Sequence, residues 1–179
     1  MPIQNAEDLF VTMLSKVHGS EQRLQKVVDE LSQAAQDQDV KDILSVRAYL
    51  TQQNVGNIEK CFQLIGKQPV QPDYRFADVW IEDVHRELGA IQNPTLKTLY
   101  ALDQARKIQN YHIGQYAALT LMASVWGNDA VTTLLEHCLT DKVEFVERTR
   151  EMFRELGRRA LGAKARERVK EKVEERMAS

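Results

Sequence analysis

Apolar residues recur alternately three and four positions apart over most of this chain, the spacing of helices that pack against other helices. The first series begins at Phe10 and Leu14 and continues to Leu31. Taken along the whole chain, the rhythm predicts five helices, over residues 6–36, 39–65, 74–91, 94–126 and from 128 or 129 to about 156.

Short side chains that cap helices stand where these segments begin. Asn5 precedes the first helix and Asp37 the second, and the pair Asn93-Pro94 is a cap followed by proline at the first helical position. Gly66 and Gly127 follow the second and fourth segments, where a left-handed residue ends a helix. These signals define the connections: two are short, and a long one contains the 74–91 segment.

Polar residues interrupt the apolar rhythm near the middle of each long helix. The interruptions are Glu21, the run that contains Gln52 and Gln53, the pair Gln109 and His112, and Lys142. Because the midpoints of antiparallel helices lie at one level, the sequence predicts a polar layer across the bundle. The preferred arrangement pairs Glu21 with Lys142, and the alternative lets either side chain reach water along the edge of its stripe.

Four long amphipathic helices in two hairpins, with one long crossover that carries a short helix, predict an all-α, ferritin-like antiparallel four-helix bundle. The bundle is expected over residues 1–156. Residues 157–179 hold eight Lys or Arg and four Asp or Glu and little that could enter a core. This second segment is therefore expected to be a charged tail, solvated or helical.

Composition narrows the class of protein further. Apolar residues make up 43% of the 179, and the formal net charge is −2, which gives no general attraction to nucleic acid or acidic membranes. We expect a cytoplasmic protein, because no secretory signal opens the chain and no apolar run could span a membrane. Cys61 and Cys138 are then expected to be reduced core thiols, with a disulfide between helices as the alternative.

Three stretches carry a resemblance to a known family: MPIQNAEDLFVTMLSKVHGSEQRLQKVVDEL, LTQQNVGNIEKCFQLIG and KIQNYHIGQYAALTLMASVWG. In order and spacing they resemble the bacterial ferritin-like stress proteins typified by YciE and YciF, over about residues 3 to 155. The resemblance implies a bacterial cytosolic setting, a homodimer and a bundle whose family-type site holds two iron ions between carboxylates.

The aligned positions depart from that family pattern. Glu21 keeps its carboxylate, whereas the segment 51–54 lacks one. Gln109 to His112 stands where the family has a Glu-His-Tyr-Glu pattern, and Lys142 falls in a segment that is acidic in the family. Because an ammonium repels cations, we expect a degenerate, metal-free site and no cofactor.

Three functions compete at this stage. The first is a non-catalytic, stress-associated structural protein. The second is an oxidative-stress metal protein in which Glu21, His112, Asp141 and Glu144 hold iron or manganese. The third is an adaptor that binds an unknown protein partner through the 74–91 helix, using Phe76 and Trp80 as exposed anchors.

Overall fold

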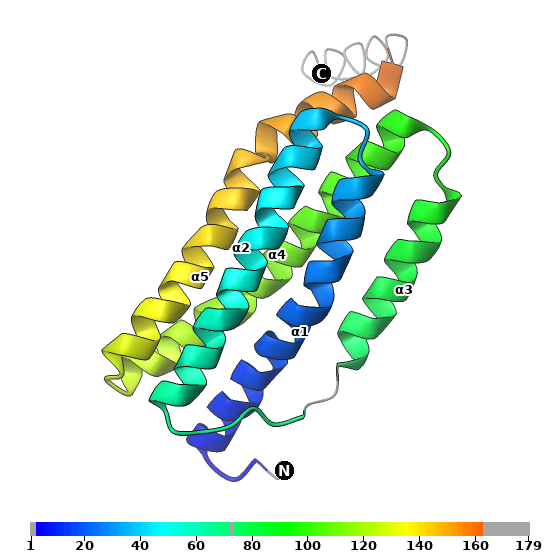
Figure 1. Ribbon diagram of the computed structural model, residues 1–179. Helices are drawn as coiled ribbons and strands as arrows, with labels where there is room; N and C mark the ends of the chain where they lie inside the picture. Colours follow the sequence, from blue (N-terminus) through cyan, green and yellow to red (C-terminus); the bar gives the residue numbers. More distant parts are fainter. Residues whose placement is uncertain (1–2, 72–73, 163–179) are drawn as a thin grey trace, which may run out of the picture.

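The computed structural model describes residues 3–71 and 74–162 of the chain. Its helices are α1 (Ala6–Ala34), α2 (Gln38–Leu64), α3 (Arg75–Ala90), α4 (Pro94–Val125) and α5 (Asp129–Arg148). Helices α1 and α2 form one antiparallel hairpin and α4 and α5 the other, while α3 lies outside the bundle on the side of α1 and α4 (Figure 1). The all-α, ferritin-like bundle with a crossover helix is confirmed.

Local capping explains why the long helices begin where they do. The side chain of Asn5 accepts a hydrogen bond from the backbone N–H of Asp8 at 2.8 Å, and Asp37, Asn93 and Asn128 cap α2, α4 and α5 in the same way. Each bond satisfies one of the N–H groups that a helix leaves unpaired in its first turn. The start of each long helix is thus set by its own sequence.

The apolar core is divided into two clusters along the bundle. One gathers around Leu24, Leu31 and Leu102, and the other around Leu14 and Leu119. Between them, on all four long helices, buried positions are polar. This level of the bundle is the polar layer, which contains Glu21, Arg47, Gln109, His112 and Lys142.

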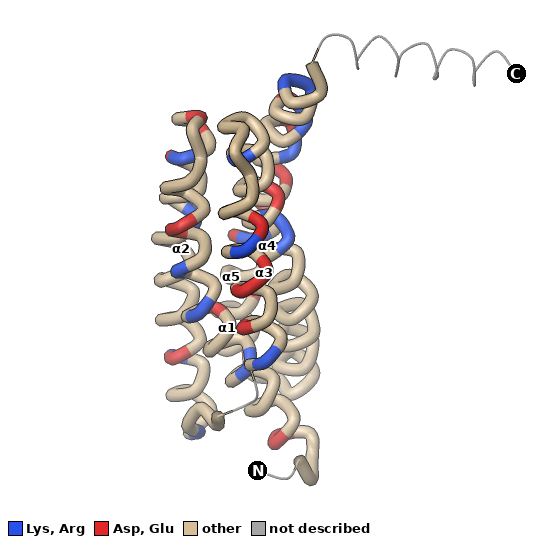
Figure 2. The backbone as a smooth tube through the Cα atoms, turned by 90° about the vertical axis from the view of Figure 1, so that its right-hand side faces the viewer, with Lys and Arg blue, Asp and Glu red and all other residues tan. Residues whose placement is uncertain are grey.

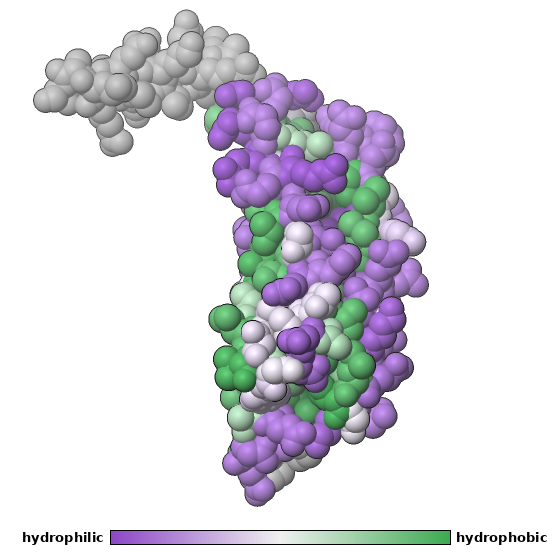
Figure 3. Space-filling model, turned by 90° about the vertical axis from the view of Figure 1, so that its left-hand side faces the viewer, coloured by the Kyte–Doolittle hydropathy of each residue, from purple (hydrophilic) through white to green (hydrophobic). Residues whose placement is uncertain are grey.

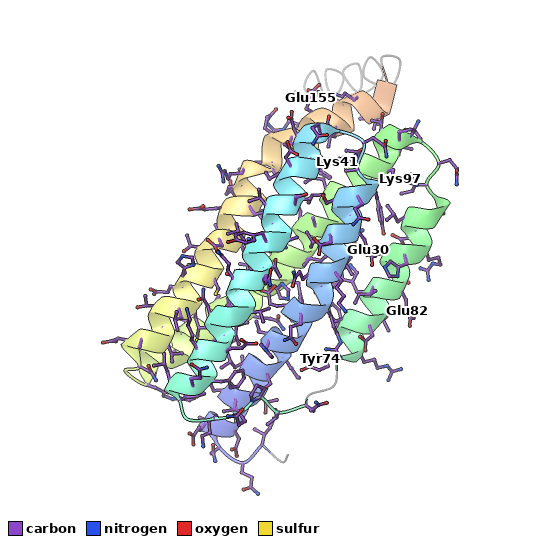
Figure 4. The ribbon with its side chains drawn as sticks, viewed as in Figure 1. Glu30, Lys41, Tyr74, Glu82, Lys97 and Glu155 are labelled. Atoms are coloured by element: carbon purple, nitrogen blue, oxygen red, sulfur yellow. The ribbon has the colours of Figure 1, made fainter. Side chains whose placement is uncertain are left out.

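Helix α3 is attached to α1 through a notch at Gly19. An added Cβ at Gly19 would lie 2.1 Å from the ring of Tyr74, so only glycine leaves room for that ring. The Arg23 guanidinium lies over the ring at 3.8 Å from its centre, and Tyr74 donates a hydrogen bond to the Ser15 carbonyl at 3.3 Å. Tyr74 therefore fixes the start of α3 against α1 (Figure 4).

The expectation that Phe76 and Trp80 form an exposed pair of anchors is wrong for Trp80. Its ring is partly buried, and its indole N–H donates to the Gln104 side chain at 3.1 Å. Phe76 is 58% exposed but stacks on Tyr111 with ring centres 4.8 Å apart. Trp80 thus attaches α3 to α4 through a hydrogen bond, and Phe76 does so through ring stacking.

The last described segment continues beyond the bundle. Helix α5 ends at Arg148, Thr149 forms a turn, and residues 150–162 are again helical, with Leu156 buried. The side chain of Arg106 donates to the Val146 carbonyl and to the Thr149 hydroxyl, both at 2.6 Å, and so binds this turn to α4. The expected tail over 157–179 is helical as far as 162, and its remainder lies outside the described residues.

In the described part of the chain, no helix is both long and apolar enough to cross a membrane.

Candidate functional site

The polar layer is centred on Glu21, whose carboxylate enters the bundle from α1 and is 1% exposed. Its Oε1 atom lies 2.5 Å from Nζ of Lys142 on α5. The same oxygen accepts a hydrogen bond of 2.9 Å from the hydroxyl of Tyr116 on α4. The carboxylate is therefore paired with a cation and bonded to a second donor, which a buried charge requires.

Lys142 lies on the buried stripe of α5, and its side chain is fully excluded from solvent. Besides Glu21, its ammonium donates to the side-chain oxygen of Gln109 at 3.4 Å and lies 5.3 Å from the centre of the Tyr116 ring. Each of these contacts is with a group that stabilises a positive charge. The ammonium thus occupies the centre of the layer.

His112 completes the layer from α4 and is also fully buried. Its Nε2 atom lies 3.0 Å from the Ser20 hydroxyl, and its Nδ1 atom lies 3.5 Å from Oε2 of Glu21, too far for a good hydrogen bond. Burial lowers the pKa of His112 to about 4, since the opposing effect of Glu21 is smaller and Lys142 and Arg47 repel a further proton. The imidazole is therefore neutral at pH 7.

The surroundings of the ion pair shift the pKa of both partners. Burial raises the pKa of Glu21, but His112, Lys142 and the hydrogen bonds from Lys142 and Tyr116 outweigh it, so the pKa lies below its ordinary value. Since His112 is neutral at pH 7, the Lys142 ammonium supplies the attraction. Burial lowers the pKa of Lys142, against the attraction of Glu21. The pairing itself rests on geometry, because the 2.5 Å between Nζ and Oε1 is short enough for a charge-assisted hydrogen bond.

Arg47 is a further buried cation in this layer, and sequence reasoning missed it. Its side chain comes from α2, is 1% exposed, and donates from Nη1 to the backbone carbonyl of Asp141 at 3.1 Å. Burial lowers its pKa, although Glu21 and Asp141 oppose that shift. The available signal was its position three residues after Leu44 and four before Thr51, which places it on the inner stripe.

Gln52 and Gln53 do not belong to the polar layer: both are exposed on the outside of α2. The inner stripe of α2 passes instead through Arg47, Thr51 and Asn54, all of which are buried. Positions one and two residues after Thr51 are rotated by about 100° and 200° around a helix of 3.6 residues per turn. The polar run was correctly located along α2, but the wrong members were assigned to its inner face.

The groups named for a possible metal ion do not converge. Oδ2 of Asp141 lies 3.7 Å from Nδ1 of His137, and Glu144 is exposed. Glu21 and His112, in contrast, are fully buried. Within residues 3–71 and 74–162, no group of three or more His, Cys, Asp or Glu side chains could hold a metal ion. A layer with one buried carboxylate and two buried cations also has the wrong charge for a pair of metal ions. The residues present therefore do not fit the di-iron site of the ferritin-like fold.

Both cysteines are free thiols buried in the core. Burial raises the pKa of Cys61 to about 12 and that of Cys138 to about 11. Thiols that remain protonated at neutral pH are poor nucleophiles and poor metal ligands. These two residues contribute packing, and Asn57 donates a weak hydrogen bond to Cys138 at 3.7 Å.

Comparison with known proteins gives matches that share this fold. Residues 5–162 match the family described as Domain of unknown function (DUF892). Protein YciF of Escherichia coli strain K12 is 23% identical over 146 residues, which cover 79% of this chain and 86% of YciF.

Two solved structures resemble the bundle over most of its length. The crystal structure of the E. coli stress protein YciF has a TM-score of 0.81 and 16% identity, and covers 87% of this chain and 99% of that one. YcfI from Rhodopseudomonas palustris, described as a candidate structural protein, has a TM-score of 0.77 and 22% identity, and covers 82% and 93%. These likenesses establish the fold that both proteins share with this chain.

Proposed function

This chain belongs to the DUF892 family, and on that premise we propose that it is a stress-associated structural protein whose internal layer holds an ion pair in place of metal ions. Membership of this family and the similarity to YciF support the general part of the proposal, that the chain is a YciF-like protein of the stress and structural type. The finer statement, a non-catalytic protein without a cofactor, rests on the polar layer, and the cytoplasmic location rests on the resemblance to the bacterial family alone.

One observation carries the proposal: Nζ of Lys142 lies 2.5 Å from the buried Glu21 carboxylate. A cation bound at Glu21 would have to displace that ammonium or lie close to it. Two unit charges about 4 Å apart repel by about 4 kcal/mol at an effective dielectric constant near 20, and a divalent ion doubles this. Arg47 adds a second positive charge to the layer.

Metal analysis tests this part of the proposal. The full chain is incubated with Fe(II) under anaerobic conditions, and separately with Mn(II), then desalted and assayed for metal per chain. We expect background metal in both cases, because Lys142 and Arg47 oppose cation binding. Near-stoichiometric iron or manganese would overturn the metal-free assignment. Lys142→Glu, which restores an acid, serves as the comparison and is expected to retain more metal than the unmodified chain.

The surface of α4 supports a homodimer as the working form. Between Lys107 and Asp129 no residue is charged, although several residues in this half of α4 are solvent-exposed. Its outer face carries Gly114, then Leu121 at 68% and Val125 at 84% exposure. In Figure 2 the lower right-hand part of the tube carries no blue or red, which means no charged residue. Figure 3 views the molecule from the opposite side, and hydrophobic side chains gather at its lower left edge.

A second copy of this chain is the occupant that such a face fits. The residues Gly114, Ala118, Leu121 and Val125 are spaced four, three and four apart, so they form one stripe along the helix. In a two-fold symmetric dimer each copy presents the same patch, and an uncharged stripe is complementary to itself. Small residues at one end of the stripe can receive the larger side chains from the other copy.

Sedimentation equilibrium measures this association. We expect the unmodified chain to be a dimer and Val125→Lys to be a monomer, because the variant would bury charges against each other. Val46→Lys, at a position on α2 that is 55% exposed, is the matched control and should remain dimeric. A monomeric unmodified chain, or a dimer that both variants leave intact, would exclude this interface without bearing on the metal result.

A further inference from the structure

The apolar stripe on α4 is small at one end and large at the other. At the small end Gly114 is exposed, and no atom lies within 4 Å of the place where a Cβ would stand. At the large end Leu121 and Val125 are 68% and 84% exposed. In a parallel two-fold dimer each residue meets its own copy, so two large ends would collide while two small ends left a gap. The shape of the stripe therefore favours an antiparallel pair, in which each large end packs on the small end of the other copy.

The charged residues that bound the uncharged stretch favour the same direction. Lys107 precedes it and Asp129 follows it, each eleven positions from Ala118, and both are exposed. With Ala118 at the two-fold axis, an antiparallel pair brings Lys107 of one copy toward the end that carries Asp129 in the other, whereas a parallel pair opposes like charges. Lys107 also pairs with Asp103 on its own helix at 2.6 Å. The attraction between copies therefore orients them and adds little affinity.

An aromatic surface continues the stripe beyond Gly114. Tyr111 stands three positions before Gly114, and its hydroxyl accepts a hydrogen bond of 3.1 Å from the side chain of Gln115. The Tyr111 ring stacks on Phe76 of α3 with ring centres 4.8 Å apart, yet Phe76 remains 58% exposed. Helix α3 lies beside α4 (Figure 1). The bundle thus leaves an aromatic side chain of α3 uncovered next to the small end of the stripe.

We propose that two copies of this chain pair through antiparallel α4 helices with Ala118 at the two-fold axis, and that the interface extends onto α3. Val125 and Tyr111 stand seven positions on either side of Ala118. Val125 of each copy then covers Tyr111 of the partner subunit and the exposed Phe76 ring stacked on it. The inference rests on the proposed homodimer and adds its direction, its register and a role for the crossover helix.

Cysteine cross-linking of the full chain tests the register. Asn110→Cys and Val125→Cys are prepared separately, refolded together so that subunits mix, and treated with a short bismaleimide. The native Cys61 and Cys138 are buried, and burial raises the pKa of both thiols, so they do not react in the folded chain. We expect a covalent dimer only in the mixture. The two Val125 residues of one dimer would lie about 21 Å apart along the helices, at 1.5 Å per residue.

The cross-linking outcomes separate this register from the homodimer itself. Val46→Cys, on α2 at 55% exposure, is the control that sets a protein concentration without random cross-links. Cross-linking of Val125→Cys to itself would overturn the register in favour of a parallel pair and leave the homodimer standing. A dimer by sedimentation that gives no cross-link in the mixture would also overturn it. A monomeric chain would overturn both the homodimer and this inference.

Phe76→Lys tests the part that α3 plays in the interface. We expect it to raise the dissociation constant of the dimer roughly tenfold, because a charge would replace a covered ring. Tyr49→Lys, on α2 at 61% exposure, is the matched control and should leave the constant unchanged. Phe76→Leu keeps an apolar side chain and should restore most of the affinity. Equal dissociation constants for Phe76→Lys and Tyr49→Lys would exclude α3 from the interface.

Discussion

Lys142 and Glu21 face each other across the centre of the bundle, with Nζ and Oε1 2.5 Å apart and both side chains closed to solvent. The pair lies between the two apolar clusters of the core, at the level where ferritin-like bundles hold metal ions. An ion pair that is fully buried costs much solvation, and it persists because each partner is bonded further, to Tyr116 and Gln109. The layer therefore depends on both charges being present.

Removing only the Lys142 ammonium should destabilise the folded chain strongly. Lys142→Met would leave the Glu21 carboxylate buried without its ammonium, and we expect a loss of about 3–5 kcal/mol in the free energy of unfolding, measured by urea denaturation. Lys107→Met is the matched control, because Lys107 also pairs with an acid, Asp103 at 2.6 Å, but on the surface. The control should lose no more than about 0.5 kcal/mol. Equal losses in the two variants would mean that burial of the pair has no energetic consequence.

His112 gives the chain a predictable pH dependence. Its pKa is about 4 in the folded state against an ordinary value of 6.5, so the unfolded chain binds a proton that the folded chain rejects. Stability should therefore fall as the pH is lowered from 6.5 toward 4, by about 2 kcal/mol between pH 7 and pH 5. In His112→Gln this contribution should be absent. Urea denaturation of both chains at the two pH values measures it, and parallel losses would contradict the assignment to His112.

The notch at Gly19 reverses the usual effect of replacing glycine in a helix. Glycine to alanine inside a helix ordinarily stabilises by about 1 kcal/mol, but a Cβ at Gly19 would meet the Tyr74 ring at 2.1 Å. We expect Gly19→Ala to destabilise the chain by about 1–3 kcal/mol, because the ring must move. Gly56→Ala, at a helical glycine with no atom within 4 Å of an added Cβ, should instead stabilise it.

A variant without the Tyr74 ring tests whether that ring causes the destabilisation by Gly19→Ala. In a Tyr74→Ala background the space beside Gly19 is vacant, so adding Gly19→Ala should cause no further destabilisation. Thermal unfolding of the two single variants and the double variant measures this coupling. Additive losses would show that the effect of Gly19→Ala arises elsewhere.

The fold could be predicted because its determinants are local. Asn5, Asp37 and Asn93 cap helices through their immediate neighbours, and the apolar rhythm alone determines which side of each helix is buried. The polar layer could be located for the same reason, since Glu21 and Lys142 interrupt otherwise regular series. Such features need no knowledge of how the helices pack.

The membership of the layer on α2 was harder to assign, because the run from Thr51 to Asn54 holds no apolar residue that marks its inner face. A helix rotation of one residue moves a side chain by about 100°, which is why Gln52 and Gln53 were assigned to the interior in place of Thr51 and Asn54. Arg47 was missed because arginine is rarely buried, and the acceptor that holds it is a backbone carbonyl with no sequence signature. The turn at Thr149 accepts a hydrogen bond from Arg106 of α4, a contact that the sequence around Thr149 does not reveal.

Unfolding of the double variant Glu21→Leu, Lys142→Met, measured beside Glu21→Leu alone, tests the buried ion pair most directly. The single variant leaves the Lys142 ammonium buried without its carboxylate, whereas the double variant removes both charges and replaces them with apolar groups. If the two residues are paired, the double variant has a free energy of unfolding equal to or above that of Glu21→Leu. A double variant clearly less stable than Glu21→Leu would contradict the pairing.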